Sequence, residues 1–138
     1  MRKPLSTRLK EQVARRADFC CEYCRLDELT SFYTFHVDHI KSIKHGGLTK
    51  ADNLAYCCPD CNFFKGTDIA TSLTDEDELI RFFNPRKDKW GEHFDLVEAA
   101  IIGKTPIGVA TEKIFKFNEP ERLIFRRQLM ELELYPTF

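Results

Sequence analysis

Apolar residues recur at every fourth position near the start of the chain, from Leu5 to Ala17. This spacing places their side chains on one side of a helix, while polar and charged residues occupy the positions between them. The pattern therefore predicts an amphipathic helix over about residues 6–18, with Ser6 or Thr7 as its N-terminal cap.

Short apolar runs replace the helical spacing in the middle of the chain. Residues 32–40, FYTFHVDHI, are rich in aromatic and β-branched residues, which predicts a strand or one arm of a hairpin. Residues 53–58, NLAYCC, predict a second short strand, and the glycines, Asn and Asp of residues 45–53 predict a loop before it. Residues 59–66, PDCNFFKG, predict a helix, because Pro favours a first turn and Gly a helix end.

The chain becomes less regular after residue 68. Residues 97–110 predict a strand, a Thr-Pro turn and the start of another element, and residues 119–134 predict a helix of mixed charge. A chain of 138 residues is long enough for one domain and too short for two. We predict a single α+β domain, with a core over about residues 18–68, an N-terminal helix and a C-terminal α/β extension over about residues 69–138.

The composition is that of a folded domain, and the net charge is too small to create a strong electrostatic field. Hydrophobic residues make up 43% of the chain and the net charge is −1. Residues 1–25 nevertheless carry seven Lys or Arg against three Asp or Glu, so a local basic face is expected there. The side chains that would contact a DNA backbone from this face, rather than simply facing water, are Arg2, Lys3, Arg8, Lys10, Arg15, Arg16 and Arg25. Lesser candidates are Arg81, Arg86, Lys87, Arg122, Arg126 and Arg127.

No segment of the sequence has the character of an export signal or a membrane span. The N-terminus lacks an apolar leader, and no run approaches the roughly 18–20 apolar residues that cross a bilayer. We therefore expect a cytoplasmic protein with no membrane partner. In that compartment six cysteines indicate metal binding rather than disulfides.

Two CxxC pairs, Cys21-Glu-Tyr-Cys24 and Cys58-Pro-Asp-Cys61, are separated by 33 residues. Four thiolates in two tight turns favour a tetrahedral zinc ion, whereas packed apolar thiols explain two matched pairs poorly. Each pair follows another cysteine, Cys20 and Cys57, so a ligand set shifted by one residue stays open. Zinc held by four cysteines has no open coordination position and is structural.

Any chemistry must therefore come from residues between and beside the pairs, above all Asp38, His39, Asn53 and Asn62. In order, spacing and identity the motifs CEYC, FHVDHI, HGGLTKADNLA and CPDCNFFKG, over residues 21–66, resemble an HNH endonuclease of the ββα-metal (His-Me finger) class. Weaker similarity to bacterial HNH proteins continues through FFNPR and IIGKTPIG. The resemblance implies a small zinc-stabilised ββα-metal core that hydrolyses DNA phosphodiester bonds.

By position in the motif, the resemblance implies that His39 is the general base and Asp38 a ligand of a catalytic divalent ion. Asn53 would brace the loop, and Asn62 would stand at the third motif position, where many relatives carry His and many Asn. An amide oxygen and one carboxylate suit Mg²⁺ or a similar ion, which keeps several waters. Imidazole, with a reference pKa of about 6.5, takes a proton near neutral pH, as phosphodiester hydrolysis requires.

Two further side chains have alternative interpretations. His36 shares a strand face with Asp38, so it either supports the metal site and phosphate or is a partly exposed strand residue. Lys65 follows Asn62 by one helical turn and either supports the site, contacts a phosphate or is solvated at the surface. Two other functions stay open, a non-catalytic zinc-stabilised DNA-binding module and a nuclease acting on RNA. The joint presence of the four motif residues favours catalysis.

Overall fold

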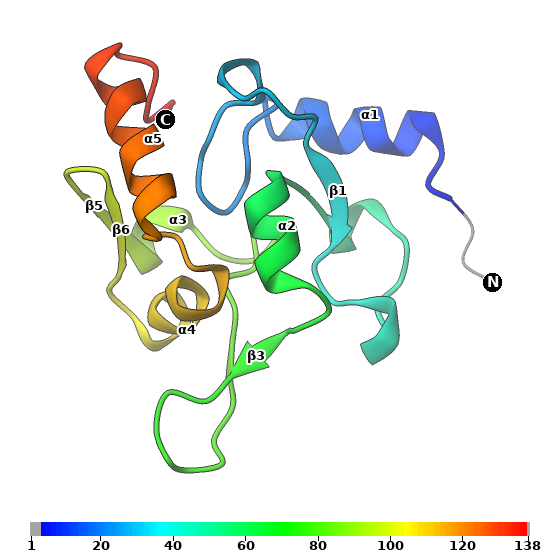
Figure 1. The fold of residues 1–138 in the computed structure, drawn as a ribbon. Helices are drawn as coiled ribbons and strands as arrows, with labels where there is room; N and C mark the ends of the chain where they lie inside the picture. Colours follow the sequence, from blue (N-terminus) through cyan, green and yellow to red (C-terminus); the bar gives the residue numbers. More distant parts are fainter. Residues whose placement is uncertain (1–3, 138) are drawn as a thin grey trace.

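The computed structural model describes residues 4–137, and its first element is the helix α1, Thr7–Arg16 (Figure 1). The Oγ of Ser6 accepts a hydrogen bond from the backbone N–H of Leu9 at 3.1 Å and so caps the first turn. Val13 is completely buried on the apolar side of the helix. The predicted amphipathic helix and its cap are confirmed.

Two antiparallel strands and a helix follow in sequence. Strand β1, His36–His39, pairs with β2, Leu54–Cys57, in a register that sets Asp38 opposite Ala55. Helix α2, Pro59–Lys65, begins two residues after β2, with Pro in its first turn as predicted. Helix α2 packs against β1, and α1 packs against both strands. The segment therefore has the ββα arrangement that the sequence predicts.

Strand β1 is shorter than the predicted strand over residues 32–40. The backbone N–H of Tyr33 is bonded to the Ser31 hydroxyl, and that of Phe35 to the Glu28 carboxylate. These local bonds take up amides that a longer ladder would need. Phe32 is 94% exposed, so aromatic content alone does not make this segment a strand.

The extension after α2 contains two further hairpins and three helices. The short strands β3 (Ala70–Thr71) and β4 (Ile80–Arg81) pair antiparallel, as do β5 (Phe94–Val97) and β6 (Ala100–Gly103). The helices are α3 (Trp90–His93), α4 (Pro106–Phe115) and α5 (Pro120–Glu131). The Thr-Pro pair does not form a simple turn. Thr105 is the N-cap of α4, and its Oγ1 accepts from the N–H of Gly108 at 3.0 Å.

One hydrophobic cluster joins the ββα segment to the extension. Tyr23 packs against Phe115 of α4 with ring centroids 4.7 Å apart, and its carbonyl accepts a hydrogen bond from the Trp90 indole at 2.7 Å. In Figure 1, α2 lies between α1 and β1 on one side and α4, α5 and the β5–β6 hairpin on the other. In the described part of the chain, no helix combines the length and apolar character needed to cross a bilayer.

Candidate functional site

The two CxxC pairs meet in space. The sulfurs of Cys21, Cys24, Cys58 and Cys61 all lie within 4.8 Å of one another, and all four residues are buried. The Cys24 and Cys58 sulfurs are 3.6 Å apart. Zinc–sulfur bonds of about 2.3 Å in a tetrahedron place sulfurs about 3.8 Å apart, so the donor set fits that ion. Among the described residues, this is the one group of three or more His, Cys, Asp or Glu placed to hold a metal.

Local backbone geometry fixes each pair. The N–H of Cys24 points to the Cys21 sulfur, and the N–H of Cys61 points to the Cys58 sulfur, each at 3.4 Å. Cys58 is also the N-cap residue of α2, so its sulfur lies at the positive end of the helix. A backbone amide therefore donates to one sulfur in each turn and helps to fix its position.

The neighbouring cysteines do not belong to the cluster. Cys20 is half-buried, with its sulfur 3.3 Å from the Thr137 hydroxyl, and Cys57 is buried in β2. Burial raises the pKa of both thiols, that of Cys57 well above its usual range. The alternative ligand set shifted by one residue is therefore excluded by the fold.

Three of the clustered thiols, those of Cys24, Cys58 and Cys61, have pKa values shifted from the ordinary range. Hydrogen bonds from the other three cysteines hold the pKa of Cys24 well below its usual range. The same hydrogen-bonding raises the pKa of Cys58, and burial raises the pKa of Cys61, both well above the ordinary value. Burial and mutual hydrogen bonding therefore disfavour ionisation of Cys58 and Cys61, and a bound divalent ion would favour it.

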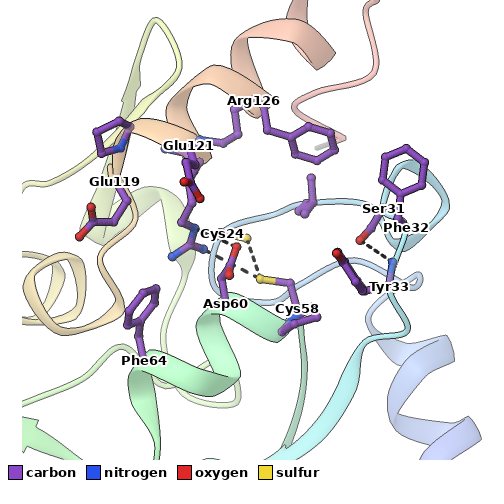
Figure 2. Close-up of a pocket in the computed structure, with 15 residues that line it drawn as sticks. Cys24, Ser31, Phe32, Tyr33, Cys58, Asp60, Phe64, Glu119, Glu121 and Arg126 are labelled. Atoms are coloured by element: carbon purple, nitrogen blue, oxygen red, sulfur yellow. Dashed lines mark hydrogen bonds and ion pairs between the residues drawn. The ribbon is translucent and has the colours of Figure 1, made fainter.

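A groove of about 750 Å³ borders the cysteine cluster (Figure 2). Its walls come from α2, from the start of α5 and from the loop that carries Phe32 and Tyr33. Cys24 and Cys58 line its floor, and Asp60, Glu119 and Glu121 stand around it. Arg122 and Arg126 also line the groove, so its three carboxylates are partly offset by two positive charges.

Asp38 is bound to α2 through a buried lysine. The Lys65 side chain is 3% exposed, and its Nζ lies 3.3 Å from Asp38 Oδ2 and 2.9 Å from the His39 carbonyl oxygen. The alternative that Lys65 is solvated at the surface is therefore wrong, because its ammonium group is used inside the fold. The Asp38 side chain remains 21% exposed, so the carboxylate is still open to solvent.

His39 lies on the opposite face of β1 from Asp38, as alternation along a strand requires. The residue is 3% exposed, and its Nε2 lies 2.9 Å from Oγ1 of Thr49. Thr49 itself is exposed, so the imidazole is only one hydroxyl away from the surface. Sequence reasoning missed Thr49, although a hydroxyl residue in the glycine loop was the available signal.

Asn53 holds the ends of the loop after β1 together. Its Oδ1 accepts from the N–H of Lys41 at 2.9 Å, and its Nδ2 donates to the carbonyls of Lys41 and Leu48 at 2.9 and 2.8 Å. Gly47 lies directly against the Lys41 backbone, where a Cβ would clash with the carbonyl oxygen. The loop that carries Thr49 is therefore fixed by side-chain bonds and close packing.

Asn62 and His36 take different positions relative to this site. Asn62 lies in the middle of α2, one turn before Lys65, and is half-buried on the helix that packs on β1. His36 is exposed at the start of β1 and shares the strand face of Asp38. The fold thus brings Asp38 and Lys65 together on one side of β1, with His39 and Thr49 on the other, and Asn62 lies one helical turn from Lys65.

Several basic residues named as DNA contacts are used inside the fold instead. Arg16 donates to the carbonyls of Ala51 and Leu54 at 2.8 and 2.7 Å, and Arg86 binds Glu22. Arg122 and Arg126 are buried. Arg2 and Lys3 lie outside the described residues. Three exposed lysines lie in the loop that follows β1: Lys41, Lys44 and Lys50.

Comparison with known proteins agrees with this geometry. Residues 21–68 match the family model of the HNH endonuclease. The matched segment spans both cysteine pairs, β1, β2 and α2, and is called the HNH domain below; the family consists typically of nucleases. Searches of curated proteins and of solved structures gave no significant match.

Proposed function

We propose that this protein is a metal-dependent endonuclease that hydrolyses DNA phosphodiester bonds at the HNH domain, residues 21–68. The observation that carries the proposal is that the motif residues are held in an ordered constellation. Asp38 is bound by Lys65, His39 by Thr49, and Asn53 closes the loop between them. Packing alone would not require polar side chains fixed one by one beside a short hairpin.

The general base in this proposal is His39. A hydrogen bond joins His39 Nε2 and the Thr49 hydroxyl at 2.9 Å. This bond holds the ring in one orientation, and orientation is part of what a general base contributes. The ring lines a groove of about 710 Å³ between α1 and β1, through which water would reach it.

Asp38 and Asn62 would hold the catalytic cation, which when bound supplies neutralisation of charge on the phosphate and leaving oxygen. One carboxylate and one amide oxygen are a small, hard donor set of the kind Mg²⁺ uses with retained waters. Lys65 contacts the Asp38 carboxylate from α2 and orients it. Because its ammonium group is buried, Lys65 is a positioning residue. The four-cysteine cluster would hold zinc and tie α2 to the rest of the hairpin.

The test is cleavage of plasmid DNA by the purified protein with Mg²⁺, without it and after EDTA. His39→Ala should lower the cleavage rate by about 10²–10⁴-fold, the usual share of general-base catalysis, with little change in DNA affinity. Asn62→Ala should be partly rescued by raising Mg²⁺ or Mn²⁺, whereas His39→Ala should not, because more metal does not replace a missing base.

The matched control is His45→Ala, which removes an exposed histidine from the same region. It should cleave like the wild type. Melting temperature and zinc content are measured for every variant, because His39 is buried and its loss also affects packing. Equal rates for wild type and His39→Ala would contradict the mechanism. If the wild type binds DNA but cleaves neither DNA nor RNA with any divalent ion, the non-catalytic binding module is the correct interpretation.

A further inference from the structure

Arg122 of α5 reaches into the cysteine cluster from the C-terminal extension. The residue is 9% exposed, and its Nη2 donates to the Cys61 sulfur at 3.1 Å. Its Nη1 donates to the carbonyls of Phe115 and Lys116 at 2.6 and 3.2 Å, which fixes the plane of the guanidinium group. Arg122 and Cys61 are 61 residues apart in the chain, so this contact exists only in the folded protein.

The negative charge of a zinc-loaded cysteine cluster requires a positively charged or hydrogen-bonding partner. Four thiolates around one Zn²⁺ leave about two negative charges in excess, and a buried net charge is costly unless an opposite charge or hydrogen bond offsets it. Asp60 is a poor alternative explanation for Arg122, because the pair is 3.8 Å apart and the Asp60 side chain is 62% exposed. The short, buried contact of Arg122 is the one to sulfur.

We propose that Arg122 is a component of the metal centre, through which metal binding at the HNH domain and docking of α5 stabilise each other. The guanidinium group supplies both a hydrogen bond to the Cys61 thiolate and a positive charge. Because the group is planar with several N–H donors, it also donates to the Phe115 carbonyl at the end of α4. This inference rests on zinc in the cysteine cluster and is independent of whether the protein cleaves DNA.

A second contact links the C-terminal segment to the other cysteine pair. The hydroxyl of Tyr135 donates to the Cys24 carbonyl oxygen at 2.7 Å. Arg126, one turn after Arg122, donates from Nε to the Ala99 carbonyl at 2.7 Å and so anchors α5 to the β5–β6 hairpin. The chain from α5 to Tyr135 therefore contacts both zinc-binding turns, and by linkage whatever weakens the docked segment must weaken metal binding.

The experiment compares Arg122→Gln with the matched control Arg127→Gln, which removes an exposed arginine from the same helix. Zinc affinity of the full chain is measured by competition with a chelating dye. Arg122→Gln should bind zinc about 10–100-fold more weakly, the usual cost of losing a partner of a metal ligand. Arg127→Gln should bind it like the wild type.

Cobalt substitution separates a contact with the thiolate from a merely structural role. A hydrogen bond and a positive charge lower the energy of the sulfur electrons, so losing them should shift the thiolate-to-cobalt charge-transfer bands of Arg122→Gln to longer wavelength. Arg126→Gln disturbs the docking of α5 without removing a bond to sulfur, and its bands should stay where those of the wild type are. Unshifted bands and unchanged zinc affinity in Arg122→Gln would overturn the proposal.

Two measurements keep the proposal testable if Arg122→Gln does not fold. Arg122→Lys retains the charge, but one ammonium group does not span Phe115 and Cys61, so an intermediate loss of zinc affinity is expected. In the wild type, removing zinc should unfold α5 enough for trypsin to cleave after Arg126, and restoring zinc should protect this bond again. Protection that does not change with zinc would refute the coupling. A wild type that binds no zinc would refute the zinc site itself, and neither result depends on DNA cleavage.

Discussion

Lys65 places a buried ammonium group between α2 and β1, beside the Asp38 carboxylate. Its ammonium group contacts the Asp38 carboxylate and the carbonyl oxygens of His39 and Gly66. Burying an ammonium group is costly unless its donors are satisfied, and here all three have partners inside the fold. The lysine therefore connects the end of α2 to β1 at the point where the two motif residues lie.

Lys65→Met should lower the free energy of unfolding by about 1–3 kcal/mol, because it leaves buried carbonyl oxygens without donors. Urea denaturation measures this change. The matched control is Lys104→Met, since Lys104 pairs with Asp95 in an exposed ion pair at 3.1 Å. Exposed pairs contribute little, so the control should change stability by less than about 1 kcal/mol. Equal losses in the two variants would contradict the role assigned to Lys65.

At the scale of elements, the loop between β1 and β2 is as important as the strands. It contains two short 3₁₀ turns, Ile43–His45 and Ala51–Asn53, and the Asn53 side chain closes it by bonding to Lys41 and Leu48. The loop presents Thr49 to His39. Because strands this short have little stability of their own, the loop fixes where the imidazole lies.

Gly47→Ala should disrupt this loop, because the new methyl group would overlap the Lys41 carbonyl and approach Asn53 Nδ2 to 2.9 Å. We expect a loss of roughly 1–3 kcal/mol, measured as a lower melting temperature, and slower cleavage. Gly91→Ala is the control, since nothing lies within 4 Å of its added Cβ, and it should be neutral or slightly stabilising. Similar melting temperatures for the two variants would show that the loop tolerates the change.

At the scale of the whole molecule, charge is distributed so that the two sides of the HNH domain differ. The groove beside the cysteine cluster is lined by three carboxylates and two arginines. The exposed lysines that follow β1 (Lys41, Lys44 and Lys50) lie in the segment that also carries Thr49. A phosphate backbone would be attracted to the lysine side, although the net charge of the chain is −1.

Replacing Lys41, Lys44 and Lys50 together by Gln should weaken DNA binding and make it less sensitive to salt. Each lost phosphate contact lowers the slope of log affinity against log salt by about 0.9, so a decrease of about 2–3 is expected. Fluorescence anisotropy with a labelled duplex at several salt concentrations measures the slope. The charge-matched control replaces Lys104, Lys113 and Arg127, all exposed in the extension, by Gln. An equal slope in both triple variants would place the DNA elsewhere.

The sequence by itself determined the parts of this protein that depend on neighbouring residues. The helix α1 follows from apolar side chains at every fourth position, and the two CxxC turns follow from the spacing of their cysteines. Helix α2 follows from Pro59 at its first position and Gly66 at its end. These signals are local because periodicity, capping and turn geometry act within a few residues.

Only the tertiary structure decided which of the polar residues meet. It selected Cys21 and Cys58 over their neighbours Cys20 and Cys57, and it buried Lys65, for which surface solvation was one open alternative. Arg122 changed from a candidate DNA contact into a partner of Cys61. The sequence does not distinguish a charged side chain that is hydrated at the surface from one that is hydrogen-bonded to a buried acceptor. The choice depends on contacts between segments far apart in the chain, which no local pattern encodes.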